Sequence, residues 1–159
     1  MNHTRYSIIR EPRGAHYRQM LTSLARLRTS ALLVLHDGIV VALGSPGQGI
    51  VAALRDHRAS EHRASKWPGT ELFYGGEATV ISMPLDAEAL AILLAATSRL
   101  YGWRQPDLPE DPCLFRADGS VVLATIAHEA DAYVDLTADE WAQVQLDWPG
   151  AGAHLEAET

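Results

Sequence analysis

Cysteine and long apolar runs are both scarce in this sequence of 159 residues. Cys113 is the only cysteine, so no disulfide can form within the chain, and a reducing compartment is favoured. The longest apolar stretches, residues 31–35 and 90–96, are far shorter than the roughly 20 residues that a membrane-spanning helix needs. The first residues also lack the apolar segment of a secretory signal. We therefore expect a soluble cytoplasmic protein that does not enter a membrane.

Several motifs of enzymes and cofactor sites are missing as well. No serine stands in a Gly-x-Ser-x-Gly frame, and the glycine-rich segment 44–49 lacks the lysine of a phosphate-binding loop. The zinc-protease pattern requires a second histidine four positions after the first, and Ala132 stands there after His128. His57 and His62 are five positions apart among cationic neighbours, which does not suit one face of a metal-binding helix. The sequence therefore predicts no cofactor and no metal ligands.

Positive charge is nearly absent from the second part of the chain. Residues 67–159 carry Arg99, Arg104 and Arg116 against sixteen acidic residues, a formal net charge of −13. Residues 1–66 carry ten cations against four acids, a net charge of +6. An asymmetry of this kind influences partners and long-range fields more than the fold. It favours a macromolecular partner over a small substrate.

The apolar pattern predicts an α+β domain over residues 1–148. Apolar residues at three- and four-residue steps predict helices from residue 15 and over 87–101, the latter capped by Asp86. Three hairpins are expected: residues 31–35 with 39–43, 71–74 with 78–83, and 113–115 with 121–126. Such an order gives an antiparallel or mixed sheet built from hairpins, with about four helices mainly on one face.

The sequence also gives expectations for the first hairpin, for the basic segment 55–66 and for the C-terminal residues. The two apolar runs of the first hairpin, residues 31–35 and 39–43, are continuous rather than alternating, so this hairpin is expected to be buried on both faces. The basic segment 55–66 is expected to be either a solvated helix end or a mobile linker. Residues 137–140 fit a capping box that starts a last helix, and residues 149–159 are expected to be a flexible tail.

His128 and Glu129 form the densest group of chemical side chains, next to Asp131. A histidine beside carboxylates can act as an acid–base pair, so a small enzyme that uses His128 and Glu129 is one hypothesis. The same residues can equally be a polar turn between two strands, if 121–126 and 133–136 are neighbours in the sheet. The sequence leaves both readings open.

A proline-rich acidic loop follows the helix that ends near residue 101. Trp103 lies there beside carboxylates, a composition that suits recognition of a basic protein surface. Core packing is the alternative role for this tryptophan. The residues predicted to contact a partner are Trp103, Asp107, Glu110 and Asp111, with Glu129 and Asp131 as secondary contacts.

Segments 103–120 and 124–133 resemble small uncharacterised bacterial α+β proteins, some of which act as immunity proteins of polymorphic-toxin systems. The similarity covers roughly residues 67–141 and carries over no catalytic residue. It implies a non-enzymatic immunity or antitoxin-like inhibitor, whose acidic face binds a basic partner such as a toxin. The main alternatives are the His128/Glu129 enzyme and a nucleic-acid-binding regulator that uses the basic N-terminal half, although no DNA- or RNA-binding motif is present. A homodimer that pairs the two charged halves is also possible on the sequence alone.

Overall fold

The computed structural model describes residues 2–27, 30–38, 41 and 43–159, which form an α+β fold around one large antiparallel sheet. The strands of this sheet are β1 (His3–Ile8), β2 (Ser30–His36), β3 (Ser60–Ala64), β6 (Ala78–Pro84), β7 (Glu110–Phe115), β8 (Val121–Ile126), β9 (Asp131–Thr137) and β10 (Leu155–Ala157). A separate hairpin consists of β4 (Lys66–Trp67) and β5 (Thr70–Glu71). The helices are α1 (Ala15–Ala25), α2 (Pro46–Asp56), α3 (Ala87–Ala96), α4 (Ala138–Asp147) and α5 (Ala151–His154), with 3-10 turns η1 (Leu100–Gly102) and η2 (Ala127–Glu129).

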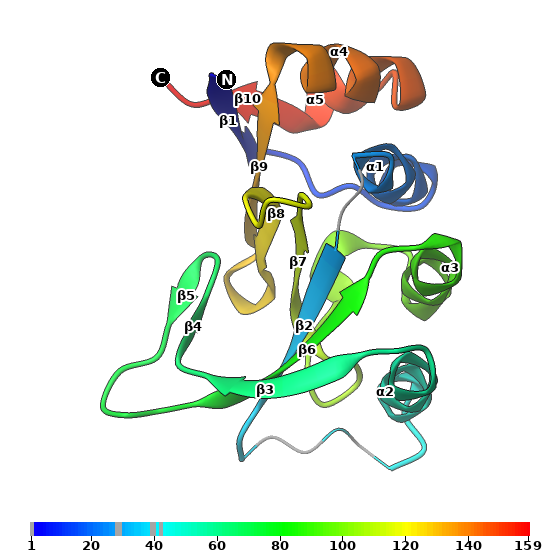
Figure 1. The fold of residues 1–159 in the computed structure, drawn as a ribbon. Coiled ribbons are helices and arrows are strands. Elements are labelled where there is room, and N and C mark those ends of the chain that lie inside the picture. The colour runs from blue at the N-terminus through cyan, green and yellow to red at the C-terminus, as the bar shows by residue number, and fades with distance from the viewer. Residues whose placement is uncertain (1, 28–29, 39–40, 42) are drawn as a thin grey trace.

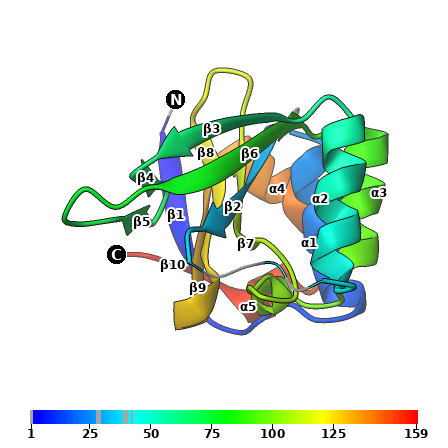
Figure 2. The ribbon, with the colours of Figure 1, turned by 90° about the horizontal axis from the view of Figure 1, so that it is seen from below.

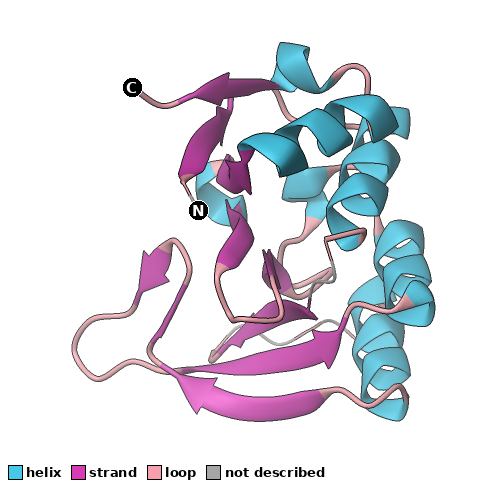
Figure 3. Cartoon of the chain, turned by 45° about the horizontal axis from the view of Figure 1, so that its top comes forward, coloured by secondary structure: helices cyan, strands magenta, loops and turns pink. Residues whose placement is uncertain are grey.

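The eight strands of the main sheet follow the order β10-β1-β9-β8-β7-β2-β6-β3, and every neighbouring pair is antiparallel. Helices α1, α2 and α3 lie together on one side of the strands, and the β4–β5 hairpin projects on the opposite side (Figures 1 and 2). Figure 3 shows the same division, with the helices gathered along one side of the molecule. The α+β class, the antiparallel sheet and the one-sided helices predicted from the sequence are thus confirmed. No helix in the described part of the chain has both the length and the hydropathy to cross a membrane.

Strand β2 is buried on both faces of the sheet, as its continuous apolar sequence predicts. Successive side chains of a strand point to opposite faces. Leu33 accordingly packs in the main core against the helices, while Leu32 and Val34 pack in a second cluster on the other face. Trp67 of the β4–β5 hairpin belongs to that second cluster, so the hairpin covers part of the face that the helices leave open.

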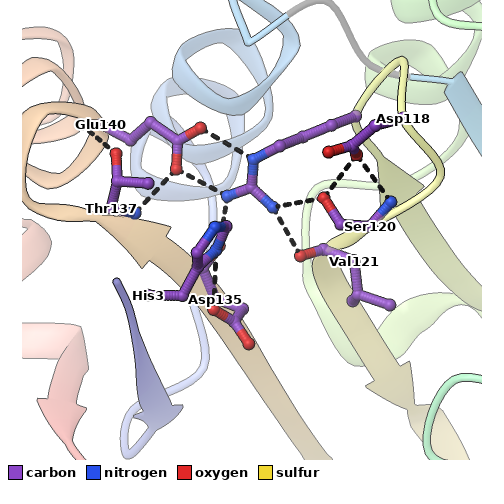
Figure 4. A network of polar contacts seen from close by, with 8 residues as sticks. His3, Asp118, Ser120, Val121, Asp135, Thr137 and Glu140 are labelled. Atoms are coloured by element: carbon purple, nitrogen blue, oxygen red, sulfur yellow. Dashed lines mark hydrogen bonds and ion pairs between the residues drawn. The ribbon is translucent and has the colours of Figure 1, made fainter. Parts of the chain in front are cut away.

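Two predicted helix starts are present. The Asp86 side chain accepts a hydrogen bond from the Ala89 amide at 2.9 Å and caps α3, which ends earlier than expected, at Ala96. Thr137 and Glu140 form a complete capping box at the start of α4. Glu140 also forms a two-bond ion pair with Arg116. Arg116 in turn donates to the Ser120 hydroxyl and to the carbonyl oxygens of Val121 in β8 and Asp135 in β9. Figure 4 shows Glu140 and Thr137 on one side of this network and Ser120 and Val121 on the other.

The structure agrees with some of the three predicted hairpins and not with others. The β7–β8 hairpin is confirmed. The second prediction is wrong in its pairing, because Glu71 pairs with Lys66 of β4, while β6 lies between β2 and β3. In the first prediction, the run 39–43 lies partly outside the described residues, and β2 has β6 and β7 as its neighbours. Apolar strands such as β2 and β6 gain more by pairing in the middle of the sheet than by pairing with the nearest run in sequence.

The basic segment 55–66 continues from the end of α2 into β3, an edge strand, and is therefore not a linker. Most of β3 is exposed and charged, which protects a sheet edge from pairing with other chains. The sequence SEHRA has no apolar alternation, so its strand conformation depends on pairing with β6.

The C-terminal residues differ from the flexible tail expected from the sequence. Residues 151–154 form α5, and β10 pairs with β1 in the register Tyr6↔Ala157 and Ile8↔Leu155. Leu155 is buried, and the Ile9 amide donates to the His154 carbonyl at 2.8 Å. The first and last strands of the chain therefore lie side by side at one edge of the sheet (Figure 1). The partner strand is almost the whole chain away in sequence, which explains why local composition suggested a frayed end.

Candidate functional site

A pocket of about 490 Å³ lies where the β4–β5 hairpin, the segment before β7 and the η2 turn meet; we call it the β4–β5 pocket. Its lining residues come from β2, the hairpin, that segment, β7, β8 and η2: His36, Gly69, Thr70, Glu71, Leu72, Arg104, Gln105, Glu110, Ile126, His128 and Glu129. The Gln105 side-chain oxygen accepts from the His36 amide at 2.7 Å and fixes the segment before β7 to the end of β2. The pocket therefore has walls from elements far apart in sequence.

A β-bulge in β7 explains the arrangement of acidic groups in this pocket. Val34 of β2 pairs with Glu110 and Leu32 pairs with Cys113, so that one residue of β2 opposes two of β7. Asp111, at this bulge, has a positive φ of 54°, a conformation that costs a non-glycine residue on the order of 1–3 kcal/mol. Consecutive residues of a regular strand would point to opposite faces. Here the ligand-type atoms of Glu110, Asp111 and His128 all lie within 4.8 Å of one another.

The Asp111 side chain is fully buried, and both of its oxygens are used. Oδ2 accepts from Trp67 Nε1 at 3.0 Å, and Oδ1 accepts from the Ala127 amide at 2.9 Å. One carboxylate thus connects β7 to the β4–β5 hairpin and to the η2 turn. These contacts hold three walls of the pocket at fixed positions.

Glu110 is also buried, and this burial raises the pKa of its carboxyl group. The neighbouring Asp111 raises the pKa further, whereas His36 and His128 lower it. His128 itself is half exposed, and its Nε2 lies 3.7 Å from Glu129 Oε1. A protonatable carboxyl group and an imidazole at the same pocket can exchange protons with a bound molecule.

Three of the six residues predicted to contact a partner are buried, which is incompatible with direct contact. Trp103 is 1% exposed and donates from Nε1 to Tyr17 Oη at 3.1 Å, inside the main core. Glu110 lines the β4–β5 pocket, and Asp111 accepts hydrogen bonds inside the protein. The acidic loop was expected to be exposed because it is rich in proline and charge, but its central residues are folded inward by the bulge and by the packing of Trp103.

The other three predicted contact residues, Asp107, Glu129 and Asp131, are exposed. Glu129 lines the β4–β5 pocket, and Asp107 lines a neighbouring hollow that shares Arg104 and Gln105 with it. Asp131 lies close enough to Tyr101, in the wall of that same hollow, to help raise the pKa of the tyrosine. These carboxylates therefore surround the same region. The strands β8 and β9 are neighbours, so His128 and Glu129 do lie in a turn between them.

The segment 70–74 contributes to this region, although it was not among the residues predicted from the sequence. Glu71 is exposed and lines the pocket, and the loop after β5 presents Phe73 and Tyr74 at 74% and 106% exposure. Two aromatic residues directly before Gly75 and Gly76 are compatible with an exposed loop, but their β propensity predicts a strand over 71–74. A protruding loop with two exposed aromatic side chains is typical of an interaction surface.

Several cations of the basic N-terminal half form ion pairs with acidic groups in the described part of the chain. Several of its arginines are paired with acids, including Arg13 with Glu11 and Arg55 with Glu61. Others bridge the two halves of the chain, in the pairs Arg26–Asp147, Arg58–Asp86 and Arg63–Glu77. Charge that is paired in this way is less available to a phosphate backbone.

His57 and Cys113, two further candidates for chemistry in the sequence, both have structural roles. The ring of His57 lies between Asp86, at 2.8 Å, and Glu88, at 3.0 Å, so it links the end of α2 to the start of α3. Cys113 is buried in the second cluster, and burial raises the pKa of its thiol to about 12. At neutral pH it is a protonated core side chain rather than a nucleophile.

A comparison of this chain with protein-family models, with curated proteins and with solved structures found no match. What the site can do therefore follows from its own geometry.

Proposed function

We propose that this protein is a non-enzymatic binding module, an immunity or antitoxin-like inhibitor that captures a basic partner protein at the rim of the β4–β5 pocket. The observation that carries the proposal is the meeting of exposed carboxylates from three separate segments beside an exposed aromatic loop. The rim consists of Glu71, Asp107, Glu129 and Asp131, and the loop presents Phe73 and Tyr74. Trp103, Glu110 and Asp111 have no contact role in this revised surface.

The rim carboxylates are electrostatically available. No ion pair within 4.0 Å joins Glu71, Asp107 or Asp131 to another residue that the structure describes. They belong to the half of the chain that carries a net charge of −13. Such a surface speeds the encounter with a basic protein, and this advantage weakens as salt screens it.

The aromatic loop is expected to contribute binding affinity, whereas the charges contribute mainly to the association rate. Exposed carboxylates at a rim contribute more to association rate than to affinity. Large aromatic side chains that become buried in a partner carry much of the binding free energy at many interfaces. Phe73 and Tyr74 follow Leu72, which lines the pocket, in the loop after β5, so both contributions can act on the same partner surface.

Differential capture from the native host tests this proposal. The wild-type protein, a rim variant (Asp107→Asn, Glu129→Gln, Asp131→Asn) and a matched control (Asp56→Asn, Asp139→Asn, Glu156→Gln) are immobilised at two salt concentrations. The control makes the same change in net charge at exposed sites away from the pocket. We expect one basic protein to bind the wild type and the control, and the rim variant to retain much less of it.

With that protein purified, the rim variant should associate about tenfold more slowly at low salt and show a flatter salt dependence. Phe73→Ala together with Tyr74→Ala should instead accelerate dissociation. Equal association rates for the rim variant and the control would contradict the proposal. Recovery of the chain itself as the sole species would point to self-association.

One observation favours a second function, an acid–base enzyme that acts on a small molecule. The pKa of Glu110 is raised at a pocket that also holds His128, which is the combination that general acid–base catalysis uses. In this alternative Glu110, rather than Glu129, is the partner of His128. It predicts that His128→Ala abolishes turnover of a substrate found by screening while the circular dichroism spectrum is unchanged.

A further inference from the structure

Three side chains that are all common metal ligands come together at the floor of the β4–β5 pocket, where Glu110 and His128 line the cavity and the fully buried Asp111 lies next to them. Glu110 and Asp111 contribute carboxylates from β7, and His128 contributes an imidazole from η2. One ligand atom of each lies within 4.8 Å of the other two. That spacing allows a single ion between them, after small side-chain adjustments, at the usual metal–oxygen and metal–nitrogen distances of about 2.0–2.2 Å.

The convergence depends on the bulge described above. In a regular strand Glu110 and Asp111 would point to opposite faces, and only one of them could face His128. The positive φ of Asp111 turns both carboxylates toward the same point. Two buried carboxylates side by side repel each other, and a divalent cation between them would remove that repulsion.

The surroundings of Asp111 resemble the outer shell of a metal site. Metal-binding carboxylates are themselves commonly hydrogen-bonded, which fixes their orientation. Asp111 accepts from Trp67 Nε1 and from the Ala127 amide, and each oxygen keeps a further lone pair for a metal. Both donors are fixed by the fold rather than by solvent, so the carboxylate is held ready before any ion arrives.

The pocket also offers room and a spare polar group. Three protein ligands leave coordination positions for water or for a group of a bound molecule, and the adjoining cavity of about 490 Å³ has room for either. Thr70 lines the same cavity, and its buried hydroxyl oxygen has no hydrogen-bond partner among the residues that the structure describes. The Thr70 hydroxyl is therefore available to hydrogen-bond a water or a ligand in the pocket.

We propose that Glu110, Asp111 and His128 bind one divalent transition-metal ion at the floor of the β4–β5 pocket, with Zn²⁺ held more tightly than Mn²⁺. A mixed set of carboxylates and one imidazole suits such ions, and Zn²⁺ follows Mn²⁺ in the general order of increasing affinity. The inference goes beyond the proposed partner binding and does not depend on it. The rim carboxylates are different residues, and a protein can occupy the rim whether or not an ion occupies the floor.

Metal titration of the purified protein tests this inference directly. The protein is prepared without a histidine tag, treated with a chelator and dialysed, and then titrated with ZnCl₂ in a calorimeter. A parallel titration with Co²⁺ follows the visible absorption bands, which report the coordination geometry. We expect one equivalent of Zn²⁺ to bind, weaker binding of Mn²⁺, and Co²⁺ bands of a four- or five-coordinate site.

Two variants and two matched controls assign the ligands. His128→Ala and Glu110→Gln should each weaken Zn²⁺ binding by more than about tenfold, because even the loss of an outer-shell partner commonly costs that much. His62→Ala and Glu156→Gln remove an exposed histidine and an exposed carboxylate away from the pocket, and should leave the dissociation constant unchanged. His128 is half exposed, so its replacement is compatible with folding, which circular dichroism verifies.

The inference is overturned by any of three results: no saturable Zn²⁺ binding up to millimolar metal, wild-type affinity in both ligand variants, or a loss of binding that His62→Ala reproduces. The last result would mean that exposed histidines bind the metal adventitiously. None of these outcomes affects the rim experiment, and a failure of the rim variant to slow partner association leaves the metal titration intact. The two proposals therefore stand or fall separately.

Discussion

Asp111 shows how much one residue can decide in this molecule. Its backbone makes the bulge, and its buried carboxylate accepts from β4 and from the η2 turn. From sequence it was one acidic residue among several in a proline-rich loop, with an expected role at the surface. A carboxylate that satisfies two buried donors is a structural centre of the pocket, not an exposed contact.

Replacement of Asp111 by alanine should lower the free energy of unfolding by about 2–4 kcal/mol, because it leaves the Trp67 indole and the Ala127 amide without acceptors. Asp107→Ala, in the exposed part of the same loop, should change it by less than about 0.5 kcal/mol. Urea denaturation followed by tryptophan fluorescence measures both. A silent Asp111→Ala substitution would show that the buried hydrogen bonds contribute little.

Glu140 is the second residue whose charge matters for stability. Its hydrogen bonds from Arg116 hold the pKa of the Glu140 carboxyl below its ordinary value of 4.5, and the Thr137 amide acts in the same direction. Both side chains are largely buried, at 12% and 18% exposure, so solvent screens the pair only in part. The same carboxylate completes the capping box of α4.

The pH dependence of this contribution has a definite sign. Because the pKa is lower in the folded than in the unfolded protein, the stabilisation is fully present above 4.5 and is lost as the pH falls through the folded value. Glu140→Gln should therefore cost about 1–3 kcal/mol at pH 7, and the difference from wild type should shrink as the pH drops below 4.5. Thermal unfolding over a pH series measures it, with exposed Glu129→Gln as the comparison. A difference that is constant with pH would rule out the ion pair as its source.

At the scale of elements, the short strand β10 is the clearest case of structure that depends on a distant partner. It contains three residues, and it pairs with β1 at the outer edge of the sheet. Leu155 packs in the main core, whereas Glu156 is exposed. Leu155 is therefore the residue through which β10 packs on the rest of the protein.

Leu155→Ala should therefore destabilise the protein by about 2–3 kcal/mol through the lost burial and the cavity that remains. Glu156→Ala should change stability by less than about 0.5 kcal/mol. Chemical denaturation gives both values, and hydrogen exchange of the β1 amides reports whether the edge opens first. If both substitutions are silent, residues 149–159 behave as the flexible tail that the sequence suggested.

Other elements were accessible from sequence to different degrees. The caps of α3 and α4 were predictable because a cap is a local bond between residues three positions apart, as in Asp86 with Ala89. The β7–β8 hairpin was predictable for the same reason, since a short turn fixes its register. Strand β3 was not, because its polar sequence becomes a strand only when β6 is beside it.

At the scale of the whole molecule, the two charged halves of the sequence meet within one chain. Arg26 pairs with Asp147, and Arg63 pairs with Glu77, each across the division that the composition suggested. The ion pairs consume part of the positive charge, while the carboxylates around the β4–β5 pocket keep theirs. The uneven charge of the sequence therefore becomes a local acidic rim, which is the basis of the proposed partner surface.

The sheet also brings together segments that are far apart in the sequence. Helices cover one face, and the β4–β5 hairpin lies over part of the other (Figure 2). Residues of that hairpin line the pocket, which therefore forms at the margin of this second cover. His36, Glu71, Glu110 and His128 come together there from four separate elements or their ends. No spacing pattern along the chain connects them, and this is why the sequence predicted the pair His128–Glu129 and not the group Glu110–Asp111–His128.

The sequence by itself determined the α+β class, the positions of α1, α3 and α4, the double burial of β2 and the acidic character of the second half. These properties follow from periodicity, caps and composition, which act over a few residues. Only the tertiary structure decided the strand order, the fate of residues 149–159, the burial of Trp103 and the pocket. Each of these depends on contacts between distant segments, and above all on a bulge at Asp111 whose unfavourable backbone conformation is held in place by hydrogen bonds from two other parts of the chain.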